Sequence, residues 1–392
     1  MREEPVESII APRPSEGAAR WCGARLSRAG IAAAQTIPAF ALDPARRIPG
    51  HDLWDMWPIE TADGRQARGS GGNLWLALAA PAAADPEARH AVARIHLVVE
   101  REAGWHLGAP VLPDGFSAGS REWSGSALFD PETGRITLFY TAAGRRGEPA
   151  TSFEQRLFQL SFALEARDDG LRAVDHRDHQ LSVAADEYWY MTVDQREGVA
   201  GMIKAFRDPA FFRDPATGRW RLFFTGSAAG SASAWNGVIG VAEAVDGSLL
   251  AWQRAPPVVD ADTLNNELER PHMRRFDGLY YLFWSTQAKV FAPDGPIGPT
   301  GLYGMVSTSA AGPFEPLNGT GLVAANPEQA PFQAYSWWVL PDLRVTSFAD
   351  LPGVAAADAP ADVARRRAAA PPRRLRRLPR ALFSAGPERQ PR

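Results

Sequence analysis

The sequence is short of cysteine: its 392 residues include only one, Cys22. A single cysteine excludes an internal disulfide and a zinc site built from several thiolates, so packing alone must hold the fold together. Cys22 itself is expected to be a small buried hydrophobe. With 45% hydrophobic residues, the chain can bury a core large enough to do so.

The chain also lacks long apolar runs and an excess of either charge. No segment is apolar enough to span a bilayer, and the first ten residues are acidic, without the basic end and apolar stretch of a signal peptide. The formal net charge of −3 argues against nucleic acid or an anionic membrane as a partner. A neutral or small ligand is favoured.

Helical periodicity is scarce as well. Residues 85–100 begin with a helical pattern and end like a strand, and alternation predicts a strand over 157–166. Apolar runs predict further strands at 72–81 and 301–309. The body of the chain therefore has the pattern of an all-β fold.

One hairpin is present repeatedly, at residues 128–141, 211–225 and 274–286. Each copy combines an Asp-Gly or Asp-Pro-x-Thr-Gly turn with an apolar run of strand length. The spacing of several tens of residues suits one four-stranded blade per copy. Counting the flanks gives a five-bladed β-propeller with a central pocket over residues 51–350, against which residues 1–50 are expected to pack.

Residues 351–392 differ in composition from the rest of the chain. They are rich in arginine, alanine and proline and show no strand alternation, so they are predicted to form a disordered basic tail. Two alternatives remain: a basic arm for nucleic acid or membrane, and a stretch outside the native reading frame of its gene.

The stretch HDLWDMWPIE places Asp55 between Trp54 and Trp57. In one interpretation Asp55 caps a turn or short helix and both tryptophans belong to the core. In the other, Asp55 is a nucleophile in a sugar pocket, because sugars pack their C–H faces on indole and a dry site strengthens electrostatic stabilisation. This stretch alone leaves both interpretations open.

Two further acidic motifs stand out. Asp208 follows Arg207 in KAFRDPAFF, where no glycine follows the proline, so a simple turn explains it poorly; an ion pair between these neighbours is the structural alternative. In NNELERPHM, an extended chain would place Glu267 and Glu269 on one face and point Arg270 away.

Paired carboxylates of this kind suit glycoside cleavage. Two like charges on one face raise each other's pKa, which would keep Glu269 or Glu267 protonated as a general acid. Retaining cleavage also needs an ionised carboxylate about 5 to 5.5 Å from the acid, and Asp55 can supply it. The innermost strands of propeller blades would bring these distant segments together.

With these residues in view, the chain resembles glycoside hydrolase family 68, which comprises levansucrases, inulosucrases and related fructosidases. The matching motifs occur in the family's order across roughly residues 20 to 350. They are LWDMWP around Asp55, WSGSA at 123–127, FRDP at 206–209, ELERP at 267–271, YYLFWS at 280–285, GLYG at 301–304, and then AYS and VTSF.

The resemblance implies an enzyme that cleaves sucrose with retention and passes the fructosyl group to fructan, an oligosaccharide or water. Asp55 would be the nucleophile, Glu269 the acid and then the base, and Asp208 would hold the fructosyl hydroxyls. The remaining site residues it implies are Trp54, Trp123, Ser124, Arg207, Glu267, Arg270, Gln287 and Tyr335. The alternatives are a mainly hydrolytic β-fructofuranosidase and a sugar-binding propeller inactivated by its altered C-terminus.

Three positions depart from the family pattern. Gln287 and Trp337 stand where many Gram-negative relatives carry histidine, and the first position is linked to acceptor handling and polymer formation. Asn266 replaces an acidic residue of the calcium-binding members, so no calcium and no other cofactor are expected. The resemblance further implies an extracellular monomer.

Overall fold

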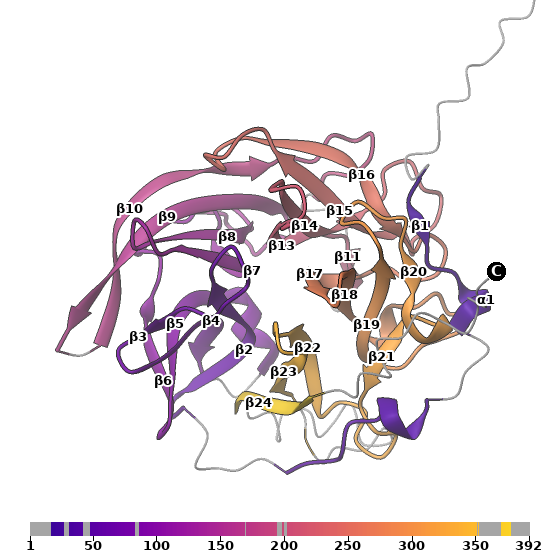
Figure 1. Cartoon of the computed structure of the whole chain (residues 1–392), viewed down its shortest axis with the longest axis horizontal. Helices are drawn as coiled ribbons and strands as arrows, with labels where there is room; N and C mark the ends of the chain where they lie inside the picture. Colours follow the sequence, from indigo (N-terminus) through magenta and orange to yellow (C-terminus); the bar gives the residue numbers. More distant parts are fainter. Residues whose placement is uncertain are drawn as a thin grey trace, which may run out of the picture.

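The strands are arranged as blades around a common centre (Figure 1). The computed structural model describes residues 17–26, 31–41, 48–82, 86–168, 170–193, 198–199, 202–350, 352 and 370–377. Its sheets form a five-bladed β-propeller, as the sequence predicts. None of the described residues belongs to a helix that is long and apolar enough to cross a membrane.

The first three blades each contain four main antiparallel strands. The first comprises β2 (His51–Glu60), β4 (Gly72–Pro81), β5 (Arg94–Arg101) and β6 (Gly104–Pro110), with the short β3 (Arg68–Gly69) paired to β4. The second comprises β7 (Arg121–Asp130), β8 (Arg135–Ala143), β9 (Gln155–Arg167) and β10 (Gly170–Val183). The third comprises β13 (Phe206–Arg213), β14 (Trp220–Ser227), β15 (Gly237–Ala244) and β16 (Trp252–Asp260).

The last two blades are less regular. The fourth comprises β17 (Glu269–Phe276), β18 (Leu279–Thr286) and β19 (Gly301–Ser307), with β20 (Glu315–Pro316) and β21 (Leu322–Ala325) both paired to β19. The fifth comprises β22 (Ala334–Val339), β23 (Arg344–Ala349) and β24 (Ala370–Arg377). The remaining elements are β1 (Ala19–Arg20), β11 (Gly198–Val199), β12 (Met202–Ile203), α1 (Gly23–Leu26), η1 (Ala33–Gln35), η3 (Pro86–Ala91), η4 (Ala288–Val290) and η5 (Leu317–Gly319).

The three predicted hairpins occupy equivalent places in successive blades. Each joins the innermost strand to its neighbour, as β7 to β8, β13 to β14 and β17 to β18. In the first two turns the aspartate, Asp130 or Asp214, accepts a backbone N–H and a threonine hydroxyl with its two carboxylate oxygens. Gly134 and Gly218 then adopt φ of 69° and 73°, which glycine tolerates best.

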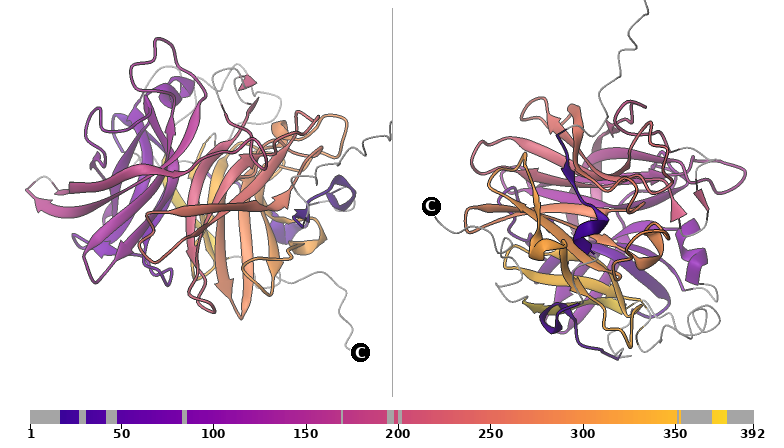
Figure 2. Two further views of the ribbon diagram at one scale, coloured as in Figure 1. Left: turned by 90° about the horizontal axis from the view of Figure 1, so that it is seen from above. Right: turned by 90° about the vertical axis from the view of Figure 1, so that its right-hand side faces the viewer.

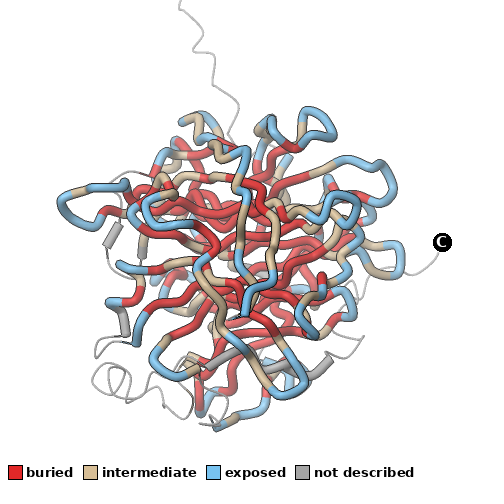
Figure 3. Tube along the Cα trace, turned by 90° about the vertical axis from the view of Figure 1, so that its left-hand side faces the viewer, coloured by how far each residue is buried: buried red, intermediate tan, exposed pale blue. Residues whose placement is uncertain are grey.

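Figure 3 shows that the buried residues concentrate along the strands and that the exposed ones concentrate in the loops between them. The strands predicted at 72–81, 157–166 and 301–309 correspond to β4, most of β9 and all of β19, and 85–100 divides into η3 and β5. In Figure 2 the long β9–β10 hairpin extends to one side of the molecule. Nearly all of the largest fully buried side chains are aromatic, so the aromatic residues serve largely as core.

A β-bulge interrupts each innermost strand near the centre of the propeller. Register shifts occur in β2, β7, β13, β17 and β22. In four of these strands a residue has a positive φ: 43° at Asp55, 59° at Asp208, 52° at Arg270 and 59° at Ser336. Bulges re-aim side chains, and a positive φ outside glycine persists only where the surrounding structure holds it. The five strands thus present polar side chains to the centre at similar depths.

The described part of the N-terminal stretch lies against the propeller. β1 pairs in parallel with β16, and Trp21 is fully buried, with its indole N–H donating to the Thr320 carbonyl at 2.9 Å. Further along, the backbone N–H of Ile37 donates to the Ala325 carbonyl at 3.0 Å. Cys22 is half-buried rather than fully buried.

The predicted disordered tail contains a strand. β24 pairs antiparallel with β23 at the edge of the fifth blade, so the expectation of disorder does not hold for Ala370–Arg377. Pro371 and Pro372 fall at a register shift between the two strands, which is where an edge strand accepts proline. The other residues of the tail lie outside the described residues, apart from Pro352.

Candidate active site

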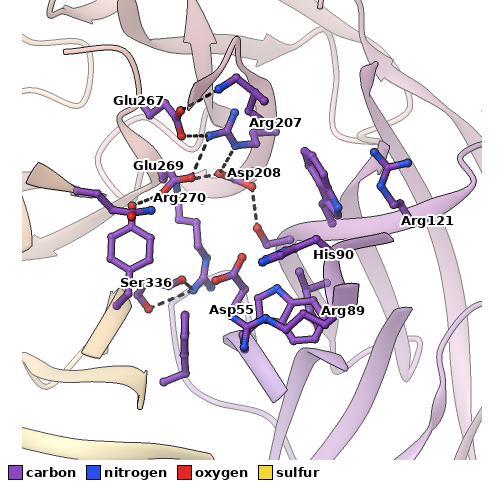
Figure 4. A pocket seen from close by; sticks show the side chains of 18 of the residues that line it. Asp55, Arg89, His90, Arg121, Arg207, Asp208, Glu267, Glu269, Arg270 and Ser336 are labelled. Atoms are coloured by element: carbon purple, nitrogen blue, oxygen red, sulfur yellow. Dashed lines mark hydrogen bonds and ion pairs between the residues drawn. The ribbon is translucent and has the colours of Figure 1, made fainter. Parts of the chain in front are cut away.

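A pocket of about 400 Å³ opens at the centre of the propeller (Figure 4), within the size range of small-molecule sites. Every site residue expected from the sequence lines it. They are Trp54 and Asp55 on β2, Trp123 and Ser124 on β7, Arg207 and Asp208 on β13, Glu269 and Arg270 on β17, Tyr335 on β22, and Glu267 and Gln287 on adjoining loops. All five innermost strands therefore contribute.

Asp208 is held by a dense set of donors. Its Oδ1 accepts the Ser124 hydroxyl at 2.7 Å, and its Oδ2 accepts the Thr225 hydroxyl at 3.3 Å and the Arg270 backbone N–H at 3.2 Å. The Arg207 guanidinium lies 3.6 Å from the same oxygen, because the positive φ of Asp208 turns these neighbours toward each other. Burial raises the pKa of Asp208 to about 6 despite these contacts.

Arg207 joins the two glutamates. Its Nη2 donates to Oε2 of Glu267 at 2.7 Å and to Oε1 of Glu269 at 2.9 Å. Glu267 also accepts the Ile203 backbone N–H and the Asn266 side-chain amide, each at 3.2 Å. The two carboxylates thus lie together, as an extended chain predicts. The sequence did not predict that Arg207 would lie between them.

The surroundings shift the pKa values of the two glutamates in opposite directions. Burial raises the pKa of Glu267 to about 7. Burial also opposes ionisation of Glu269, but the Arg207 guanidinium and a hydrogen bond from the Tyr335 hydroxyl lower its pKa below the ordinary value. The prediction that like charge raises both pKa values is wrong for Glu269, because the two donors stabilise its anion.

Asp55 lies on β2 across the pocket from Glu269 (Figure 4). Burial raises its pKa, and the charge of Glu269 adds to this effect, while Arg270 lowers it. The residue as a whole is half-buried, and it lines the pocket. Its position inside a strand at a bulge excludes the cap interpretation, so Asp55 is available to a ligand.

Arg270 lies in the pocket wall, and the expectation from strand geometry that it points away is wrong. Its φ of 52° turns the side chain toward the centre, where Nη2 donates to the Met56 carbonyl at 2.8 Å and Nη1 donates to Ser336. Behind it, His272 accepts the Val339 N–H at its Nε2, so its Nδ1 carries the hydrogen that bonds the Arg270 carbonyl. These contacts fix Arg270 between β2 and β22.

Two of the three departures from the family pattern, Gln287 and Trp337, lie in different environments. Gln287 lines the pocket and forms a side-chain hydrogen bond with Tyr335. Trp337 is fully buried in the core of the fifth blade and contacts Tyr335 edge-on at 5.7 Å. Only Gln287 can therefore contact a ligand directly.

Sequence reasoning missed one side of the pocket, which is lined by Arg89, His90, Phe348 and Asp350. Arg89 and His90 belong to η3, in a loop that the sequence marked only as ambiguous. Asp350 follows β23 directly. No local motif identified Arg89, His90 or Asp350, and Phe348 was noted only as the end of the VTSF motif, because these residues meet only where the first and last blades adjoin.

The oxygens beside Glu267 are occupied by an ammonium group. Nζ of Lys204 donates to Oδ1 of Asn236 at 2.6 Å, to Oδ1 of Asn266 at 2.9 Å and to the Ala234 carbonyl at 2.5 Å. A calcium ion needs six to eight oxygens, several of them carboxylate. Within the described part of the chain, no group of three or more His, Cys, Asp or Glu residues could hold a metal. The residues here therefore do not fit calcium.

The arrangement combines the carboxylate of Asp55, which faces the pocket, the paired carboxyl groups of Glu267 and Glu269, and a wall of indole rings. Apolar sugar faces pack on indole, and three carboxylates at one centre suit a reaction that passes through a positively charged sugar. Asp208 is held in place by three hydrogen bonds and so suits binding rather than attack. The site has the composition of a glycosidase active site.

Comparison with known proteins agrees with this geometry. The levansucrase/invertase family model (glycoside hydrolase family 68) matches residues 15–236 and 230–383. A levansucrase of Rahnella aquatilis is 32% identical over 345 residues, covering 76% of this chain and 78% of that protein. The structure of an inulosucrase from Halalkalicoccus jeotgali bound to kestose superposes with a TM-score of 0.80 at 35% identity, over 91% of this chain and 92% of that one. A Microbacterium saccharophilum β-fructofuranosidase catalytic domain gives 0.76 at 25% identity, over 88% and 86%.

Proposed function

Because the chain belongs to glycoside hydrolase family 68 and is a fructosyltransferase of the levansucrase type, we propose that it cleaves sucrose through a fructosyl-enzyme formed on Asp55. The fructosyl group then passes to a growing fructan, to an oligosaccharide or to water. The observation that carries this proposal is the convergence of Asp55, Asp208 and Glu269 from three blades on one pocket.

In the first step a carboxylate oxygen of Asp55 attacks the anomeric carbon of the fructosyl unit. The bond from that carbon to the glucosyl oxygen breaks, and Glu269 donates the proton that the leaving glucose needs. In the second step an acceptor hydroxyl or water attacks the same carbon from the vacated side, Glu269 takes its proton, and the bond to Asp55 breaks. Two inversions give net retention.

The proton for the first step comes from the glutamate pair. Burial raises the pKa of Glu267 and so favours its protonated form, and both carboxyls contact Arg207. Two strongly interacting acids titrate as a unit, so transfer of one proton from Glu267 to Glu269 needs no exchange with solvent. Tyr335 fixes the orientation of the receiving carboxylate.

Asp208 and Arg270 are assigned to binding. A carboxylate held by Ser124, Thr225 and a backbone N–H is rigid and can accept hydrogen bonds from the fructosyl hydroxyls as charge develops on the ring. Trp54 and Trp123 form the apolar walls, and Ser124, Arg207 and Glu267 complete the site.

The test is separate measurement of the glucose and fructose that the purified chain releases from sucrose. Glucose in excess of free fructose supports fructosyl transfer. A folded, monodisperse sample that releases neither sugar would contradict the proposal and favour a sugar-binding propeller without turnover.

Hydrolysis is the second candidate activity. It is favoured by Gln287, which lies at the position linked to acceptor handling, and by the similarity to a β-fructofuranosidase. Equal release of glucose and fructose at all sucrose concentrations would identify a hydrolase that uses the same site.

We further propose that the enzyme acts outside the cell and as a monomer, as the resemblance implied. Fractionation of the source cells and light scattering of the purified protein test the two statements. Activity confined to the cytosol would contradict the first, and a stable dimer would contradict the second.

A further inference from the structure

Four side chains that the proposed mechanism does not use share the side of the pocket next to Asp55. Arg89 and His90 come from η3 in the first blade, and Phe348 and Asp350 come from the end of β23 in the fifth (Figure 4 labels the first two). This is where the propeller ring closes, since β2 packs against β22 and β23 (Figure 1).

Arg89 is a desolvated cation at this junction. Its side chain is 3% exposed, and its guanidinium lies 4.9 Å from the ring centre of Trp54 and 5.8 Å from that of Phe348. Nη2 of Arg89 is 3.8 Å from Oδ1 of Asp350. A buried guanidinium needs an opposite charge and polarisable faces, and Arg89 has both.

The Arg89–Asp350 pair is connected to the proposed nucleophile, Asp55, through the neighbouring residue Trp54. Trp54 precedes Asp55 on β2. The Arg89 guanidinium lies over the face of the Trp54 indole, and the His90 ring contacts it edge-to-face, with ring centres 5.5 Å apart. Burial lowers the pKa of His90 to about 3, so this imidazole is neutral at physiological pH and Arg89 is the cation of the cluster.

The charges that face Asp55 come from four blades. Arg270 and Glu269 face it from β17, Asp208 from β13, Arg89 from η3 and Asp350 from the end of β23; Ser336 on β22 adds a hydrogen bond. Arg89 favours the ionised form of Asp55, whereas Asp350 opposes it. Lys289 faces Asp350 and His90 from η4.

We propose that Arg89 is a positioning residue that, paired with Asp350 across the closure of the ring, holds the Trp54 wall and keeps Asp55 ionised for attack. This inference rests on the proposed function. It adds a functional residue to a loop that no motif of the sequence marks.

The test compares Arg89→Met with Asp350→Asn, using the pH dependence of kcat/KM for glucose release from sucrose. Arg89→Met is expected to move the acid limb of this pH profile to higher pH by on the order of half a unit. The reason is that Asp55 loses a nearby positive charge that favours its ionised form. It should also lower kcat by about tenfold with a smaller change in KM, since the wall beside the reacting carbon loosens. Asp350→Asn is expected to leave the acid limb unchanged or move it downward.

Arg274 supplies the matched control. It is also a buried arginine that joins two blades, with Nη2 2.8 Å from Glu60 Oε1 and the Trp338 ring 5.7 Å away, but it does not line the pocket. Arg274→Met is expected to lower the melting temperature without moving the acid limb. Arg89→Lys retains the charge and is expected to keep the acid limb in place while restoring only part of kcat. If Arg89→Met does not fold, Arg89→Gln, which also removes the charge, replaces it.

An acid limb that moves the same way in Arg89→Met and Asp350→Asn, or in neither, would overturn the inference, because a purely structural link predicts no difference of sign. So would an equal shift in Arg274→Met. These results require an active parent protein, whereas a parent that releases no glucose refutes the proposed function instead.

Discussion

Nη2 of Arg207 lies 2.9 Å from Oε1 of Glu269, so the general acid of the proposed reaction contacts a permanent cation. Despite burial, this contact helps to lower the pKa of Glu269, whereas burial raises the pKa of Glu267 to about 7. The pair, rather than either residue, therefore determines the pH range of activity.

The pH dependence of kcat/KM on sucrose should be bell-shaped. Activity should rise as Asp55, whose pKa is raised, becomes ionised, and should fall near pH 7 as the glutamate pair loses its proton. Glu267→Gln removes the proton reservoir and the neighbouring charge, so the basic limb should move to lower pH. A basic limb that is unchanged in this variant would show that Glu267 does not supply the proton.

Asp55→Asn should abolish sucrose cleavage while leaving the fold intact, with a loss of roughly 10⁴-fold or more. Asparagine tolerates the positive φ of 43° at this position, so the bulge of β2 should survive. Glucose release and the melting curve are measured on the same sample. Near-normal turnover would remove Asp55 from the nucleophile role.

Glu269→Gln should reduce sucrose cleavage by roughly 10²- to 10⁴-fold. An aryl fructoside with an acidic phenol does not need protonation to leave, so formation of the fructosyl-enzyme from it should be nearly unaffected. The comparison is the first turnover of both substrates by stopped flow. Equal losses on the two would argue that Glu269 has another role.

Gln287→His should increase the share of fructosyl groups transferred to sugars relative to water, because Gln287 lines the pocket and hydrogen-bonds Tyr335. Trp337→His is the contrasting variant: it removes a fully buried ring and should lower the free energy of unfolding by roughly 3 kcal/mol. Product analysis and denaturant unfolding separate the effects. An unchanged transfer share in Gln287→His would contradict the assignment.

Lys204→Met should lower the free energy of unfolding by about 1 to 3 kcal/mol, because three oxygens lose a charged donor. Arg254→Met removes a partly exposed cation near Asp186 and should cost less than about 1 kcal/mol. EDTA should leave the activity of the parent unchanged. Loss of activity with EDTA, restored by calcium, would contradict the assignment of Lys204 as the internal cation.

The sequence predicted those parts of the fold and site that depend on local patterns. The Asp-Pro-x-Thr-Gly and Asp-Gly turns located three blades, and the motifs around Asp55, Asp208 and Glu269 located the pocket. The prediction from strand geometry was wrong for Arg270, because the direction of its side chain depends on a bulge that no sequence pattern marks.

The remaining features depend on contacts between distant segments. The lowered pKa of Glu269 requires Arg207 and Tyr335, which come from other blades. Arg89 and Asp350 meet only when the ring closes. The strand β24 contains prolines and arginines that argue against a strand, and it forms because the edge of β23 needs a partner.

The most direct test of the account is to trap the fructosyl-enzyme. Glu269→Gln would be mixed with the aryl fructoside, quenched in acid and digested, because without its base this variant should accumulate the intermediate. The account predicts a peptide that carries one fructosyl unit on Asp55, located by mass spectrometry. A fructosyl unit on another residue, or none while the variant releases the phenol, would contradict it.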